Sequence, residues 1–117
     1  NDTIATVYAP LPFPDVPEPQ HGDPKYFALF KELHGRTSPG QFHDYCIVYN
    51  RSADEIRWYV DGELINQERR VPEKIGGFTV ALGLMTEKDI GPDGSTSLHG
   101  QGLMGEWGPV RITRRAV

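Results

Sequence analysis

The clearest periodicity in the chain lies between residues 42 and 69, where runs rich in β-branched and aromatic side chains are separated by short polar breaks. The first two runs, 42–50 and 55–60, are separated by residues 51–54, and a third run follows directly after Asp61-Gly62. An aspartate–glycine pair readily adopts the positive φ angles of a tight primed turn. The pattern therefore predicts a three-stranded antiparallel meander over residues 42–69.

Within this meander, Ile56, Trp58 and Val60 fall on one strand face because successive side chains alternate between faces. The first run, 42–50, carries apolar residues at odd and even positions. Apolar residues on both faces are typical of a sheet that is covered on both sides. Cys46 lies in this run and is predicted to be a small buried hydrophobic residue.

Alternating runs at 3–9, 78–85 and 108–113 predict three further strands. One short helix is predicted over residues 24–33, where apolar residues repeat with helical spacing. Asp23-Pro24 supplies an N-cap and a first-turn proline, and Gly35 stands where a glycine ends a helix. A strand over 25–30 is the alternative, because its aromatic and leucine residues are also common in strands.

Two stretches read as loops. Residues 10–24 hold six of the ten prolines, which remove backbone donors and exclude a central strand. Residues 86–102 are rich in glycine, serine, aspartate and histidine. A loop of this length is uncommon without a structural or functional reason.

The length of the chain and its net charge limit the classes of function that the sequence can have. With 117 residues, the chain is long enough for one domain at most and can also be part of one. Its formal net charge is −4, with a pI near 5.5. Because phosphate binding needs a basic face, this balance argues against nucleic-acid and acidic-membrane partners. A lone cysteine cannot form an intramolecular disulfide and fits either a cytoplasmic or a secreted protein, so the compartment stays open.

The sequence contains no secretory leader and no transmembrane stretch. The first predicted strand begins almost at Asn1. This predicts a processed form or a fragment of a longer chain.

The meander carries a family resemblance. Phe42-His43-Asp44-Tyr45 and Trp58-Tyr59-Val60-Asp61-Gly62 resemble the "F-H-x-Y-x-I-x-W/Y … I-x-W-Y-V-D-G" hairpin of the concanavalin A-like lectin and glucanase superfamily, which laminarinase- and laminin-G-like proteins share. Residues 1–13 are also similar to uncharacterised actinobacterial proteins with such a predicted domain. The resemblance implies an all-β antiparallel sandwich of jelly-roll type.

The resemblance transfers a fold and not an activity. Glucanases of that superfamily carry a catalytic Glu-x-Asp-x-Glu strand, and this motif is absent from the sequence. Their complete jelly rolls are also much longer than this chain. We therefore expect the C-terminal half of such a sandwich, completed by a second chain or an N-terminal half, or a reduced version of it.

Candidate ligand-binding residues gather in the glycine-rich stretch 95–108, where His99 and Gln101 offer polar groups and Trp107 offers a stacking face. With Tyr8 they suit a sugar, which is apolar on one face and hydroxylated around its rim. The structural alternative is a glycine-rich connection that packs onto the sandwich. Glu106 is a weak candidate acid, because its aromatic neighbour can raise the pKa of the carboxyl by desolvation.

No metal site is predicted, since the four histidines lack metal-ligand spacing. Residues 87–94 offer acidic groups that could hold calcium, without the regular oxygen spacing of a calcium loop.

Three functions remain open at this point. The first is a non-catalytic, lectin-like carbohydrate-binding module with a glycan or small-molecule ligand. The second is an enzyme: a glycoside hydrolase whose catalytic strand lies on a missing N-terminal half or partner chain, or a small-molecule tailoring enzyme. The third is a structural or interaction domain.

Overall fold

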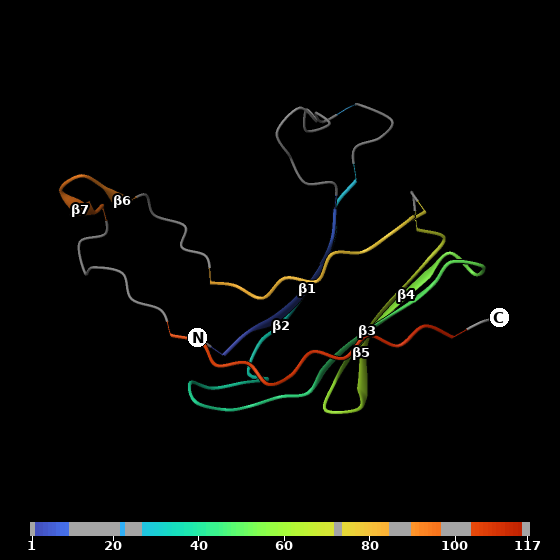
Figure 1. Ribbon diagram of the computed structural model, residues 1–117, viewed down its shortest axis with the longest axis horizontal. Helices are drawn as coiled ribbons and strands as arrows, with labels where there is room; N and C mark the ends of the chain where they lie inside the picture. Colours follow the sequence, from blue (N-terminus) through green and yellow to red (C-terminus); the bar gives the residue numbers. More distant parts are fainter. Residues whose placement is uncertain are drawn as a thin grey trace. The chain divides into compact units, whose positions relative to one another are not determined.

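The computed structural model describes residues 2–9, 22, 27–71, 74–84, 90–96 and 104–115. The regular structure in these ranges is entirely β, in three antiparallel sheets, and no helix occurs among them (Figure 1). The chain divides into two compact units, residues 1–76 and 77–117, which are treated separately below. The prediction of an all-β antiparallel protein is confirmed.

The predicted meander is present in the first unit. Strands β3 (Tyr45–Asn50), β4 (Glu55–Val60) and β5 (Glu63–Arg69) form a sheet in that order. Asp61 and Gly62 join β4 to β5 with φ angles of 51° and 81°, as the primed turn requires.

A second, two-stranded sheet replaces the predicted helix. β1 (Ile4–Tyr8) pairs with β2 (Leu29–Leu33), with Ile4 opposite Leu33 and Tyr8 opposite Leu29. The helix prediction over 24–33 is wrong for residues 27–33, and residues 24–26 lie outside the described ranges. Pairing with β1 supplies the backbone hydrogen bonds that a helix would have made internally, so tertiary context overrides a local preference.

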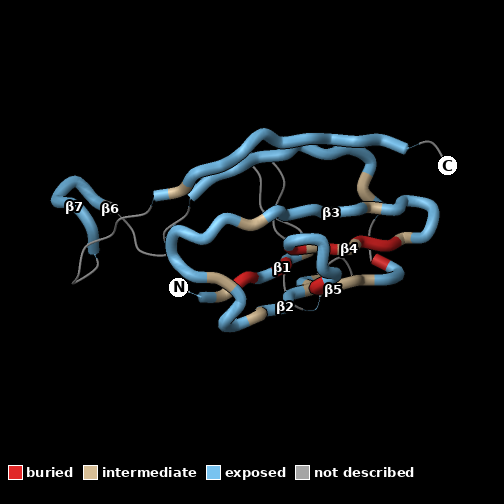
Figure 2. The backbone as a smooth tube through the Cα atoms, turned by 90° about the horizontal axis from the view of Figure 1, so that it is seen from below, coloured by how far each residue is buried: buried red, intermediate tan, exposed pale blue. Residues whose placement is uncertain are grey.

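The core of the first unit lies between these two sheets. Figure 2 shows the buried positions on β1, β4 and β5 and just after β5. Lys31 Nζ donates to the carbonyl of Ile65 at 2.8 Å, and Asn66 Nδ2 donates to Thr6 Oγ1 at 2.8 Å. These bonds join the sheets around a buried apolar cluster made of Ile4, Ile56, Trp58, Val60, Ile65 and Val71.

Strand β3 differs from the sequence expectation. It lies at the edge of its sheet, where β4 is its one hydrogen-bonded neighbour among the described strands. Ile47 is 65% exposed and Val48 42%, although they point to opposite faces, and Cys46 is exposed as well. The predictions that Cys46 is buried and that this strand is covered on both faces are therefore wrong for the described structure.

The second unit holds a short hairpin, β6 (Ile90–Gly91) paired with β7 (Gly94–Ser95), inside the predicted loop 86–102. Residues 78–84 and 108–113, predicted to be strands, form no ladder among the described residues. A strand requires a neighbouring strand that takes its backbone hydrogen bonds. Alternation of apolar and polar residues in the sequence does not by itself supply that neighbour. The proline-rich stretch 10–24 lies outside the described ranges except for Gly22.

Candidate functional site

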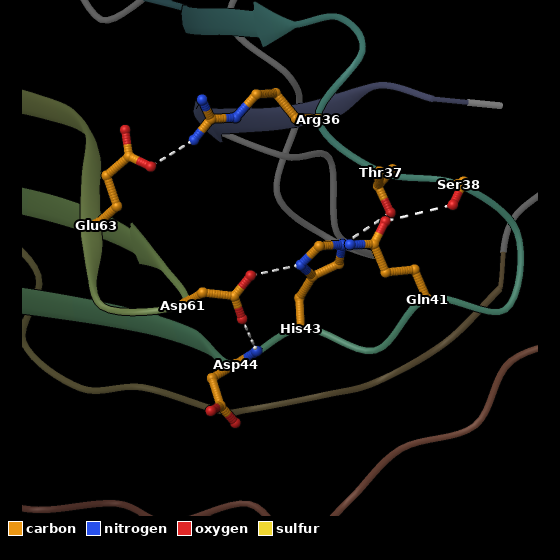
Figure 3. Close-up of polar contacts among 8 residues, drawn as sticks. All are labelled: Arg36, Thr37, Ser38, Gln41, His43, Asp44, Asp61 and Glu63. Carbon is orange, nitrogen blue, oxygen red and sulfur yellow. Dashed lines mark hydrogen bonds and ion pairs between the residues drawn. The ribbon is translucent and has the colours of Figure 1, made fainter.

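The most tightly connected polar group in the first unit centres on His43, just before β3 (Figure 3). His43 Nδ1 lies 2.7 Å from Asp61 Oδ2, and His43 Nε2 lies 2.9 Å from Thr37 Oγ1. Because a carboxylate only accepts hydrogen bonds, Nδ1 carries the proton, and in the neutral ring Nε2 accepts from the Thr37 hydroxyl. The imidazole is almost enclosed, with 4% of its side chain exposed.

The register of the meander places Asp61 opposite the start of β3. The backbone N–H of Asp61 donates to the carbonyl of Asp44 at 2.8 Å, and that of Asp44 donates to Asp61 Oδ1 at 2.9 Å. The carboxylate therefore accepts one bond from a backbone amide and one from His43, while its side chain stays 53% exposed. Asp61 is held rigidly and remains open to solvent.

Thr37 is held by the beginning of the chain. The backbone N–H groups of Arg36 and Thr37 both donate to the carbonyl of Asp2, at 3.0 and 3.3 Å. Beyond Thr37 the chain turns at residues 38–41, where the backbone N–H of Gln41 donates to the carbonyl of Ser38 at 3.1 Å. These bonds fix the segment that leaves β2, and the contacts of His43 with Thr37 and Asp61 connect it to the β4–β5 turn.

Two further groups border this cluster. Arg36 and Glu63 form an ion pair at 2.7 Å with both side chains largely exposed. The ring of Tyr45 meets that of His43 edge-on, with centroids 5.9 Å apart, and Tyr45 is 64% exposed. We call this surface the rim; it consists of Arg36, Thr37, Tyr45, Asp61 and Glu63.

The electrostatics of the rim favour an ionised Asp61. The hydrogen bond from His43 and then the backbone bond from Asp44 hold the pKa of the Asp61 carboxyl below its ordinary value of 3.8. Because the folded-state pKa is lower than the unfolded value, the carboxylate stabilises the fold above the unfolded pKa. That contribution is lost as the pH falls through the folded pKa.

We therefore expect wild type to be more stable than Asp61→Asn at about pH 6, and the difference to shrink as the pH falls from about 4 to about 2. Urea denaturation midpoints of both chains across this range measure it. A difference that stays constant down to about pH 2 would show that the charge of Asp61 contributes nothing.

A hydroxyl, an imidazole and a carboxylate in this order also match the arrangement of a nucleophile, a base and its orienting acid. The same bonds also have a structural role, because they join the segment after β2 to the β4–β5 turn. We interpret Thr37, His43 and Asp61 as a clamp that fixes the rim. The exposed polar and aromatic side chains that can contact a ligand are then those of the rim.

Two of the residues predicted to form a site, Glu106 and Trp107, are described in the second unit. A Cβ atom on Gly105 would lie 2.9 Å from Cη2 of Trp107 and 3.2 Å from Cδ2 of Leu84, so the indole packs over a position that only glycine leaves free. Trp107 remains 50% exposed. Glu106 lies exposed on the surface, without the apolar enclosure on which its role as an acid depended.

Of the remaining predicted site residues, the structure describes only Tyr8. Tyr8 belongs to the first unit, where it packs against the apolar core and lies 5.2 Å from the ring of Phe27. His99 and Gln101 lie outside the described residues, so their role in ligand binding stays a prediction.

The sequence interpretation missed the rim. In the sequence, His43 falls within the first predicted run, 42–50, and Asp61 within the predicted turn, with no sign that the two meet. The information that was missing is the register with which β3 and β4 pair. Once β3 and β4 are paired through Tyr45 and Val60, the residues just outside this pair must also lie side by side.

Metal binding receives no support from the described part of the chain, where no group of three or more histidine, cysteine, aspartate or glutamate side chains is placed to hold an ion. The predicted calcium segment 87–94 is only partly described, so calcium there stays a prediction. Among the described residues, no helix has the length and apolar character needed to cross a bilayer.

Comparison with known proteins gives one match. A family model with the description "Family of unknown function (DUF6081)" matches residues 1–116. Neither the curated proteins nor the solved structures include a match to this chain.

Proposed function

We propose that this chain, which belongs to the DUF6081 family of unknown function, is a non-catalytic carbohydrate-binding module. Its ligand would contact the rim. We also propose that the two sheets of the first unit belong to a β-sandwich of the concanavalin A-like type. This fold proposal is supported by the resemblance of the meander and by the apolar core between the two sheets.

The chemistry of a sugar fits the composition of the rim. Sugar hydroxyls need both donors and acceptors, and the apolar C–H face of the ring packs against aromatic side chains. Asp61 and Glu63 offer carboxylate acceptors, Arg36 offers donors, and Tyr45 offers an exposed ring. All four side chains are connected through the clamp or through the ion pair between Arg36 and Glu63.

The observation that carries the proposal is the Asp61 carboxylate, which is fixed by two hydrogen bonds, is still half exposed, and is bonded to His43, whose ring contacts Tyr45. Each carboxylate oxygen keeps a further acceptor site when it already accepts one bond. A group held in place before binding loses little conformational entropy when a ligand arrives. Asp61 therefore offers a preorganised acceptor to a hydroxyl group.

The test is a glycan-array screen of the chain, followed by calorimetric titration with the best glycan. We expect Tyr45→Ala to weaken binding about tenfold, which corresponds to the loss of one aromatic contact. Phe30→Ala is the matched control. It removes a similarly exposed aromatic ring, 57% accessible, from β2, and should leave affinity unchanged.

Two results would reject the proposal. One is a chain that binds no glycan at millimolar concentration. The other is a Tyr45→Ala variant that binds as tightly as the Phe30→Ala control.

A further inference from the structure

The opposite end of the three-stranded sheet carries a basic pocket. The β4–β5 turn lies at one end of β4, and residues 51–54, which connect β3 to β4, lie at the other. At that second turn an open pocket of about 250 Å³ is lined by Arg51, Ser52 and Lys74. These three described lining residues belong to the first unit, and none of them is part of the rim.

The pocket exists because the segment after β5 is fastened to the turn. The backbone N–H of Val71 donates to the carbonyl of Asp54 at 3.1 Å. The backbone N–H of Ile75 donates to the hydroxyl of Tyr49, on β3, at 2.9 Å. These two bonds flank Lys74 in sequence and hold it against the turn that carries Arg51.

The turn itself is ordered. The side chain of Asn50 accepts a hydrogen bond from the backbone N–H of Ala53 at 3.2 Å. Asp54 then adopts a φ angle of 50°, which aspartate tolerates better than most residues. Arg51 and Ser52 are thus carried on a defined backbone.

The charges of the pocket do not cancel. Lys74 Nζ lies 3.3 Å from Asp54 Oδ1, an ionic contact in which this buried oxygen accepts no hydrogen bond. For Arg51, no ion-pair or hydrogen-bond partner lies among the residues that the structure describes. Among the described residues at this turn, the two cations Arg51 and Lys74 stand against one carboxylate, that of Asp54, on a chain whose net charge is −4.

We propose that this pocket binds an oxyanion, the carboxylate, sulfate or phosphate group of a small ligand. The guanidinium of Arg51 presents paired N–H donors whose geometry matches two oxygens of such a group. The Ser52 hydroxyl can donate one bond, and Lys74 supplies a second positive charge that Asp54 already positions.

The pocket is open to solvent, so the affinity for a lone anion should be low. Ion pairs at exposed sites are weak and are screened by salt. We expect a dissociation constant on the order of 1 to 10 mM for an inorganic anion. An acidic sugar can add contacts outside the pocket and bind more tightly.

The test is a two-dimensional NMR titration of the full chain with sodium sulfate, sodium phosphate, sodium glucuronate and glucose, at an ionic strength kept constant with sodium chloride. We expect saturable shifts of the amide signals of Arg51, Ser52 and Lys74 with the three anions and none with glucose. Arg51→Gln should weaken anion binding at least fivefold. Arg111→Gln, which removes the same charge from an exposed residue of the second unit, should change it less than twofold.

The anions also distinguish the source of the ligand. Tighter binding of glucuronate than of sulfate and phosphate identifies an acidic sugar, whereas tighter binding of the inorganic ions identifies free anions, and both support the pocket. Shifts that sodium chloride alone reproduces would overturn the proposal. Equal weakening in Arg51→Gln and Arg111→Gln would overturn it as well. The readout is independent of glycan binding at the rim, so each site can fail without the other.

Discussion

Trp58→Ala is expected to lower the free energy of unfolding of the first unit by about 3 to 5 kcal/mol. Trp58 lies in the middle of β4, is 8% exposed, and belongs to the apolar cluster between the two sheets. Replacing a buried indole by a methyl group removes its apolar contacts and leaves a cavity that neighbouring strands cannot fill. Because small domains are stable by only about 5 to 15 kcal/mol, much of the molecule should unfold at moderate urea.

The matched control is Trp107→Ala, the same change at a half-exposed position of the second unit. It should cost about 1 kcal/mol or less, as substitutions outside a core usually do. Urea denaturation followed by far-ultraviolet circular dichroism measures both variants without depending on tryptophan fluorescence. Equal losses in the two variants would show that Trp58 does not sit in the core described here.

His43→Ala is expected to cost about 2 to 3 kcal/mol at neutral pH, from a lost buried side chain and from partners that lose a hydrogen bond. The Thr37 hydroxyl would lose its acceptor and Asp61 one of its two donors. The segment 36–42 would then be tied to the β4–β5 turn less firmly, so glycan affinity at the rim should fall together with stability.

The control for this variant is His34→Ala. His34 is 70% exposed, and its ring interacts with Thr3 at 2.9 Å and with Glu32 at 3.5 Å. Contacts of this exposed kind contribute less than about 1 kcal/mol. Urea midpoints compare the two variants, and a loss in His43→Ala no larger than in His34→Ala would contradict the clamp.

The meander was predictable because its determinants are local. The aspartate–glycine pair at 61–62 specifies the turn, and the positions of Ile56, Trp58 and Val60 specify the buried face. These features need no information from elsewhere in the chain. The same holds for the first strand, predicted over 3–9 and found at Ile4–Tyr8.

The helix prediction failed where the outcome depended on a distant partner. Residues 27–33 carry aromatic and leucine side chains that suit either structure, and pairing between β1 and β2 decides for a strand. The edge position of β3 is likewise a property of the assembled sheet. The apolar residues of β3 therefore predicted a burial that Ile47, Val48 and Cys46 do not have.

The candidate site could not be predicted from local sequence patterns, because its residues come from separate parts of the chain. The clamp unites residues 37, 43 and 61, which meet only when the register of β3 and β4 is known and when Asp2 holds the backbone of Thr37. The basic pocket similarly depends on hydrogen bonds that bring Lys74 to a turn some twenty residues earlier in the chain. The sequence shows which residues have charged or polar side chains, but it does not show which of them become neighbours in the fold.

The proposal that the rim binds carbohydrate is tested most directly by a two-dimensional NMR titration of the wild-type chain with the best glycan from the array. We expect saturable shifts of the amide signals around the rim, above all those of Thr37, Asp44, Tyr45 and Gly62. Shifts that are confined to the signals around Trp107 would place the site in the second unit. That result, or the absence of any saturable shift with every glycan tested, would contradict binding at the rim.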